Sequence, residues 1–176
     1  MTAATEPAMV RYGHYRLLGP MLLFHVIGDP IGQGNIRHLG KGRPAIHQNQ
    51  HLLLPWRQTV TATAHNAKPE ATARMRREFP LTGPVGLHCH FTVAKPKSAP
   101  KRRRTFPVTR PDLSHYVRAI EDALQKAGVY GDDAQIVDLS ATKHYPGEHA
   151  QALDVPGVVI YVYAVSDEAN EREVTP

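Results

Sequence analysis

The feature that most constrains the fold is a row of hydrophobic residues spaced for one side of a helix. Four of them recur at intervals of four, three and four positions: Leu113, Val117, Ile120 and Leu124. This spacing is typical of an amphipathic α-helix that packs one side against a core. Asp112 is well placed to cap the helix and Gly128 to end it. Such a helix needs a sheet or another helix to cover its hydrophobic side.

The rest of the chain supplies strands and a second helix. Four stretches have the composition of strands: about 21–28, 85–94, 134–145 and 155–165. An alanine-rich stretch from Leu54 to about Glu78 predicts a helix, with a break at Pro69. The order is strand, helix, strand, helix, strand, strand. It predicts an α+β domain with a small mixed sheet of about four strands and two main helices.

The strand expected at 85–94 alternates in character. One face carries Leu87, Cys89, Phe91 and Val93, and the other carries His88, His90 and Thr92. Two histidines two positions apart can bind a metal. Without further ligands in the segment, histidines that face solvent or an interface are favoured. The single cysteine is expected to be a buried, inert thiol.

Length and composition favour one soluble domain with a charged partner. Of the 176 residues, 1–20 are expected to form a flexible arm, 21–166 the folded domain and 167–176 a flexible tail. The net charge of +5 favours a polyanion. One cysteine excludes an internal disulfide and suits a reducing cytosol. The sequence has neither a membrane-spanning run nor a secretory signal, so a cytoplasmic protein without membrane contact is expected.

Six carboxylates lie between Arg110 and Asp138, although the chain is basic. Mg²⁺ prefers carboxylate oxygens, water and substrate phosphate. Asp112 before the helix and Asp133 before the next strand are candidates to converge on such an ion. The alternative is that Asp112 only caps the helix and Asp133 belongs to a turn. A polar arc flanks the hydrophobic side of the helix: Ser114, Arg118, Glu121 and Gln125. It is either a solvated face or the wall of a cleft, with Arg118 toward a phosphate and Glu121 toward a metal or Arg118.

Two basic segments predict contact with nucleic acid. The stronger one contains Lys95, Lys97, Lys101, Arg102, Arg103 and Arg104. The other is the glycine-rich segment 35–43, with Arg37, Lys41 and Arg43. Both have the charge expected for contacts with a phosphate backbone, and neither has the spacing of a P-loop. The alternative for each is a solvated loop.

The stretch RPDLSHYVRAIEDALQKAGVYGDDAQIVD, residues 110–138, resembles the core motif of the RusA family of Holliday-junction resolvases. The family pattern is a basic residue, D-x-D-N-x-x-K, D-A-L and D-D-x-Q-[IV]-V. Asp112 matches its first aspartate, Asp122-Ala123-Leu124 its D-A-L, and 132–137 its D-D-x-Q segment. Upstream, GDPIGQGNIR, PWRQTV and KPKSAPKRRR resemble the family's opening, its W-R-x-x-V helix and its basic loop.

The resemblance implies a homodimer that binds four-way DNA junctions and nicks paired strands with Mg²⁺ or Mn²⁺, in recombination and repair and often in phages. It implies an acidic site formed by Asp112, position 114 and Asp133. Arg118 replaces the motif lysine beside the phosphate. Arg110 and Lys143, which lie where the family has basic residues, join the residues expected to contact DNA.

Ser114 is the main departure, because it stands where the family has its second aspartate. His115 replaces the family's asparagine. Three outcomes are open. Glu121 supplies the missing carboxylate from further along the helix, which is our hypothesis. Alternatively, Ser114 holds a metal-bound water, or the protein binds junctions in phage DNA processing without cutting them. A different DNA or RNA nuclease on the same scaffold is a further alternative.

Overall fold

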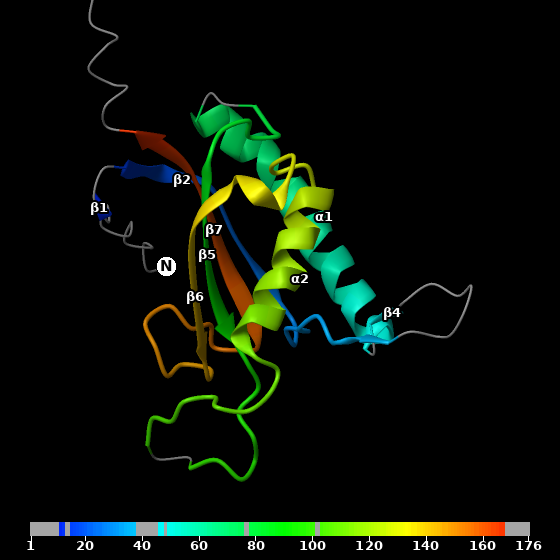
Figure 1. The fold of residues 1–176 in the computed structure, drawn as a ribbon. Coiled ribbons are helices and arrows are strands. Elements are labelled where there is room, and N and C mark those ends of the chain that lie inside the picture. Colours follow the sequence, from blue (N-terminus) through cyan, green and yellow to red (C-terminus); the bar gives the residue numbers. More distant parts are fainter. Residues whose placement is uncertain are drawn as a thin grey trace, which may run out of the picture.

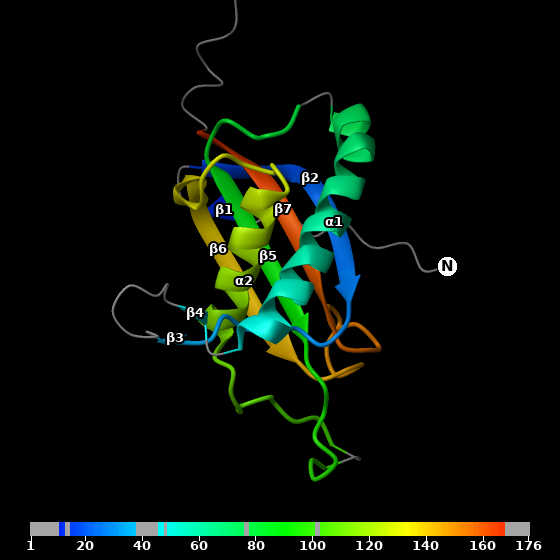
Figure 2. The ribbon, with the colours of Figure 1, turned by 90° about the vertical axis from the view of Figure 1, so that its right-hand side faces the viewer.

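Two helices lie on one face of a mixed β-sheet (Figures 1 and 2). The structure is a computed structural model, and it describes the following residues: 11–12, 15–37, 46–47, 49–75, 78–100 and 103–167. The elements are, in chain order, β1 (Arg11–Tyr12), β2 (Tyr15–Ile27), β3 (Ile36–Arg37), β4 (Ile46–His47), α1 (Gln50–Met75), β5 (Val85–Thr92), α2 (Leu113–Lys126), the 3-10 helix η1 (Asp133–Gln135), β6 (Ile136–His144) and β7 (Gly157–Asp167).

The main sheet has the strand order β1-β2-β7-β5-β6, and β3 pairs separately with β4. β5 and β6 run parallel, whereas the other neighbours in the main sheet run antiparallel. A parallel pair needs a long crossover, and α2 provides it between β5 and β6. β6 is an edge strand because it is last in this order, and α2 packs beside it. The predicted α+β fold with a small mixed sheet and two main helices is confirmed.

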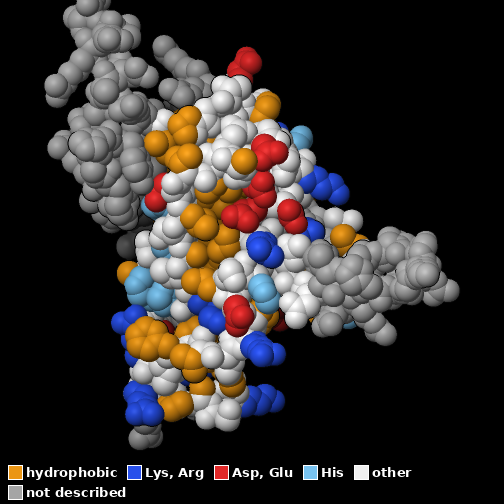
Figure 3. All heavy atoms as spheres, in the orientation of Figure 1, with side chains coloured by type: hydrophobic (Ala, Val, Ile, Leu, Met, Phe, Trp, Pro, Cys, Tyr) orange, Lys and Arg blue, Asp and Glu red, His pale blue; other side chains and the backbone are white. Residues whose placement is uncertain are grey.

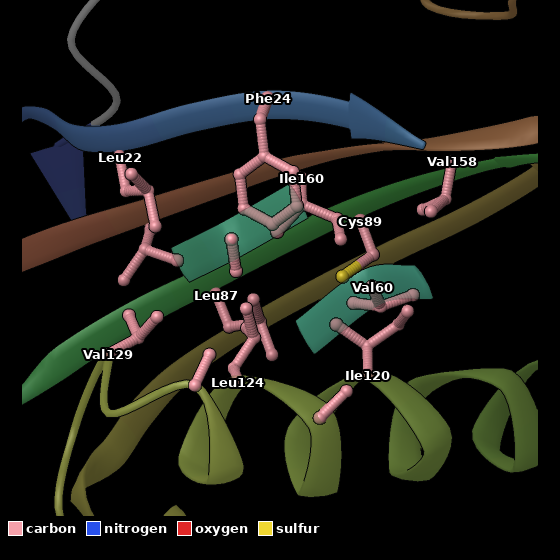
Figure 4. Close-up of a cluster of buried hydrophobic side chains, with 14 of the residues drawn as sticks. Leu22, Phe24, Val60, Leu87, Cys89, Ile120, Leu124, Val129, Val158 and Ile160 are labelled. Carbon is pink, nitrogen blue, oxygen red and sulfur yellow. The ribbon is translucent and has the colours of Figure 1, made fainter. Parts of the chain in front are cut away.

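The core lies between the two helices and the sheet face that they cover (Figure 4). From α2, Val117, Ile120 and Leu124 are buried, and Leu113 packs partly buried at the edge of the core. From α1, the buried residues are Leu53, Trp56, Val60, Ala64 and Ala71. They meet the β5 residues Leu87, Cys89 and Phe91. The predicted apolar faces of the second helix and of the central strand are thus confirmed.

The structure differs from the prediction in the N-terminal arm and in the first helix. β2 begins at Tyr15, although 1–20 were expected to form a flexible arm, because β7 extends far enough to pair with these residues up to Tyr15–Asp167. α1 passes through Pro69 without the predicted break. Pro69 is exposed, so the carbonyl left unpaired one turn earlier faces water. The expected flexible stretches 1–10 and 168–176 lie outside the described residues.

The other face of the sheet carries no helix in the described part of the chain (Figure 1). His88 and His90 of β5 lie on this face, beside Tyr161 and Tyr163 of β7. Among the described helices, none is long and apolar enough to cross a membrane.

Candidate functional site

The two aspartates of the D-D-x-Q segment have different environments: Asp132 is hydrogen-bonded within the fold, and Asp133 is exposed. The Asp132 carboxylate accepts a hydrogen bond from the Ala134 amide, and Gln135 Oε1 accepts one from the Asp132 amide. This capping box builds η1. Gln135 Nε2 also donates to the carbonyls of Leu81 and Gly83 at 2.9 Å, which ties η1 to the segment before β5. Asp133, the next residue, stays exposed at the end of α2.

A chain of polar contacts joins the other family motifs. The Arg57 guanidinium donates to the Asp122 carboxylate and, at 2.8 Å, to Gln33 Oε1. Arg57 belongs to the PWRQTV segment, Asp122 to the D-A-L segment and Gln33 to the GDPIGQGNIR segment. Asp122 therefore links α2 to α1. No role was expected for Arg57 or Gln33 from the sequence, where their only signal was membership of these segments.

The loop 28–34 is held against the first turn of α2. The Gln33 amide donates to the His115 carbonyl at 2.8 Å. The Asn49 side chain accepts from the Gly34 amide and donates to the Gly32 carbonyl. A Cβ at Gly32 would lie 3.0 Å from Pro111 Cβ, so only glycine fits this approach without displacement. The backbone that precedes Asp112 is thereby packed on one side.

Asp112 is the N-cap residue of α2, but its side chain makes no capping hydrogen bond to the described first turn. The backbone closes the turn instead, with the His115 amide donating to the Asp112 carbonyl at 3.1 Å. The alternative in which Asp112 only caps the helix is therefore not supported. Its carboxylate is exposed, at the positive end of the helix dipole.

Lys143 of β6 lies beside this end of α2. Its Nζ donates to the carbonyls of Thr109 and Pro111 at 2.9 and 3.0 Å, and lies 5.9 Å from the centre of the Tyr116 ring. Burial lowers the pKa of Lys143, and the charge of Asp112 opposes this effect. A cavity of about 200 Å³ opens beside these groups, and Asp29 and Arg110 also line it.

Within one chain, Asp112 and Asp133 do not meet. Asp112 precedes the first residue of α2, and η1, which begins with Asp133, follows the far end of this helix (Figure 1); the 14 residues of α2 span about 21 Å. Metal–oxygen distances of about 2.0–2.6 Å are incompatible with such a separation. Accordingly, no three of the described histidine, cysteine, aspartate and glutamate side chains gather where they could hold one ion.

Glu121 belongs to the Asp133 end of the helix. Burial is the largest cause that raises the pKa of Glu121. The charges of Asp133 and Asp122 raise this pKa further, while Arg118 lowers it. Figure 3 shows acidic side chains gathered on the face over α2. Ser114 lies two turns away, about 10 Å along the axis. Glu121 therefore stands beside Asp133 and does not reach Asp112 in the same chain.

The predicted basic residues fall into three groups. Lys95 is paired with Glu148, whose pKa is lowered by the hydrogen bonds from Lys95 and from the Thr105 amide. No pattern in the sequence marked Glu148. Other basic side chains are exposed: Lys97, Arg103, Arg104, Arg110 and Arg118. Lys101, Arg102, Lys41 and Arg43, as well as the side chain of Arg37, lie outside what the structure describes.

The histidines of β5 are held by neighbours on the same sheet face. His88 Nε2 lies 2.8 Å from the Asp138 carboxylate, and His90 Nδ1 lies 2.8 Å from the Thr142 hydroxyl. Burial lowers the pKa of His90 to about 4, aided by the nearby His88. Cys89 points into the core, where burial raises the pKa of its thiol. These side chains lie on β5 and not at the ends of α2.

Comparison with known proteins shows the family of the chain. A protein of Bacillus subtilis (strain 168), named uncharacterized protein YqaN, is 28% identical over 134 residues, which cover 71% of this chain and 88% of the relative. The family model described as endodeoxyribonuclease RusA matches residues 35–156, which include both ends of α2 as well as α1 and β6. Since this match covers more than half of the sequence, the chain belongs to the RusA endodeoxyribonuclease family.

Proposed function

We propose that the protein is a metal-dependent endodeoxyribonuclease that resolves four-way DNA junctions by paired nicks and acts as a homodimer. The observation that carries this proposal is that two of the motif carboxylates have structural partners, whereas two others are exposed. Asp122 pairs with Arg57, and Asp132 caps η1. Asp112 and Asp133 remain exposed at the two ends of α2.

The available side chains suit Mg²⁺ or Mn²⁺. Both ions favour oxygen ligands, and Mg²⁺ is often held by one or two protein carboxylates, with water and phosphate completing its shell. Asp112 offers one carboxylate, and Glu121 with Asp133 offers two. A bound ion would stabilise charge that develops on the phosphate and lower the pKa of a bound water. Arg118, exposed between the two ends, is placed to donate to a phosphate.

The length of α2 favours a dimer. If a second copy packs with its α2 antiparallel to the first, Asp112 of each chain faces Glu121 and Asp133 of the other. Each of the two sites then contains carboxylates from both chains. Glu121 would thus supply the carboxylate that Ser114 lacks, across the interface and not along its own helix. Two equivalent sites related by a two-fold axis also suit a pair of symmetric nicks.

The surface beside α2 favours a second copy of the chain as the partner. Val137 and Leu139 of the edge strand β6 are 57% and 50% exposed. Figure 3 shows hydrophobic side chains running beside the acidic group on this face. Exposed apolar side chains next to an incomplete polar site are typical of an interface. A second copy of the chain buries them and completes the site in one step.

Complementation between two inactive variants tests the proposal. Asp112→Asn and Asp133→Asn homodimers should each bind a four-way junction and fail to cut it in Mg²⁺ or Mn²⁺. After subunit exchange, a mixed dimer has one site with both changes and one site with neither. The mixture should therefore recover cleavage, mostly as a single nick. Activity that stays absent in mixtures shown to contain mixed dimers rules out sites shared between chains.

A second candidate is a junction-binding protein that does not cut. Ser114 favours it, because this exposed residue stands where the family has a carboxylate and cannot replace its charge. The wild-type chain would then bind the junction tightly and show no nicking with either ion. Equal affinity for linear duplex and four-way junction would exclude junction selectivity in both candidates. Cleavage of an RNA substrate in preference to a junction would instead indicate another nuclease on this scaffold.

A further inference from the structure

Among the basic residues that the structure describes, Lys143 has an environment unlike that of a free DNA contact. An ammonium group has three N–H donors and no acceptor. Two hydrogen bonds go to the carbonyls of Thr109 and Pro111, and the ring of Tyr116, itself 5% exposed, lies 5.9 Å from the nitrogen. At most one N–H donor is left for a phosphate. In contrast, Lys97 is exposed in the basic loop.

The two carbonyls bracket Arg110 and Pro111, immediately before Asp112. The Asp112 side chain has no capping bond to the described first turn of α2, so the backbone that leads to it decides where its carboxylate lies. On one side, that backbone meets the loop 28–34 through Gly32. On the other side it is bonded to Lys143, which projects from β6. Lys143 therefore connects the sheet edge to the start of α2.

We infer that Lys143 is a positioning residue: it fixes the 109–111 backbone to β6 so that the Asp112 carboxylate is held where a metal ion and the scissile phosphate meet. This inference rests on the proposed function. A residue that orients a ligand in this way acts on metal affinity and turnover and not on the affinity for DNA. Lys143 thus differs in role from the exposed cations of the basic loop.

Lys143→Met keeps the aliphatic stem and removes the donors. We expect kcat on a four-way junction to fall about 10- to 100-fold, and the Mg²⁺ concentration for half-maximal cleavage to rise by a similar factor. The junction Kd and its salt dependence should stay as in the wild type. Hydrogen exchange in the 109–115 segment should become faster, measured without metal or DNA. This readout does not depend on activity.

Two control variants make the comparison specific. Lys97→Met should weaken junction binding, reduce the salt slope by about one and leave the exchange of 109–115 unchanged. Lys126→Met removes an exposed charge from the last turn of α2 and should leave the junction Kd, kcat and exchange unchanged. Lys143→Arg retains donors for both carbonyls, so it should recover most of the lost turnover.

The inference is overturned if Lys143→Met lowers the junction affinity and the salt slope of binding as Lys97→Met does, and leaves hydrogen exchange in 109–115 unchanged. Should Lys143→Met fold poorly, nitrogen-15 NMR of the wild-type lysine ammonium groups decides instead. The Lys143 signal should show slowly exchanging protons that persist when the junction is added without metal. A Lys143 signal that changes as a phosphate contact forms contradicts the inference. Absence of cleavage by the wild type would refute the proposed function, whereas the exchange and NMR results would still report on the backbone contact.

Discussion

The Arg57 guanidinium donates to the Asp122 carboxylate across 65 residues of sequence and so joins α1 to α2. The same guanidinium reaches Gln33, in the loop that packs on the start of α2. Three segments that resemble family motifs are therefore one physical assembly. Their contribution is to hold the helices and the loop in a fixed arrangement, while the carboxylates proposed for chemistry are Asp112 before α2, Glu121 on it and Asp133 in η1.

Breaking this pair should affect stability more than chemistry. Asp122→Asn leaves the Arg57 charge, whose side chain is 19% exposed, without its carboxylate. Because Asp122 is 43% exposed, water compensates in part, and we expect a loss of about 1 kcal/mol in the free energy of unfolding. Urea denaturation measures it, with the exposed Glu70→Gln on α1 as control. A loss of cleavage in fully folded Asp122→Asn would mean that Asp122 takes part in the reaction.

Changes at the two adjacent aspartates of the D-D-x-Q segment should have different effects, on stability at Asp132 and on cleavage at Asp133. Asp132→Ala removes a cap and should lower the free energy of unfolding by about 1 kcal/mol. For a chain of this size, such a loss lowers Tm by about 2–4 °C. Asp133→Asn should not lower Tm and should abolish junction cleavage. Thermal melts and cleavage assays on both variants test this, and the reverse pattern would assign the metal site to Asp132.

Glu121→Gln should be more stable than the wild type at neutral pH without metal. Burial and the charges of Asp133 and Asp122 raise the pKa of Glu121 in the folded state, so its ionised form destabilises the fold. As pH falls through that raised pKa, the folded wild type takes up a proton in preference to the unfolded chain and regains stability. The advantage of the variant should shrink toward acidic pH. Melting temperatures of both proteins across this range measure the effect.

The same variant tests the role of Glu121 in metal binding. In the proposed dimer, Mn²⁺ should raise the melting temperature of the wild type and raise that of Glu121→Gln much less. Junction cleavage by Glu121→Gln should also be lower than that of the wild type. If Glu121→Gln keeps full Mg²⁺-dependent cleavage, Glu121 does not supply the carboxylate that Ser114 lacks.

The basic loop should contribute unevenly to the salt dependence of binding. Lys97→Ala should reduce the slope of log K against log salt by about one. Lys95→Ala should change it less, because Lys95 is paired with Glu148 and its positive charge is already balanced. Junction binding measured at several salt concentrations tests the difference. Equal slopes for both variants would show that the Lys95–Glu148 pair opens on DNA.

The architecture was predictable because it depends on local periodicity. The spacing of Leu113, Val117, Ile120 and Leu124 predicted α2 and its buried side, and the alternation at 85–94 predicted the faces of β5. The passage of α1 through Pro69 was not predictable, because it depends on that residue facing water, which only the packed structure decides. The early start of β2 depends likewise on the length of its partner β7.

For the proposed site, the sequence indicates candidate members and not their arrangement. Asp112, Asp133 and Glu121 are marked as candidate carboxylates, without any distances between them. Convergence of Asp112 and Asp133 in one chain was an open expectation, and the length of α2 excludes it. Lys143 looked like a cation for DNA, because a sequence does not show that two carbonyls already accept its hydrogen bonds. Residue type determines which chemistry is available, whereas tertiary contacts determine which groups remain free for it.

The length of α2 also has a consequence for the product. In the proposed antiparallel dimer, the two cutting centres are separated by about one helix length, about 21 Å. The helix would then set the spacing between the two nicks on the junction. Inserting one turn into both helices would leave each Asp112 facing the carboxylates opposite it and move the two centres about 5–6 Å further apart. The helix that packs one side of the core would thus also fix where both strands are broken.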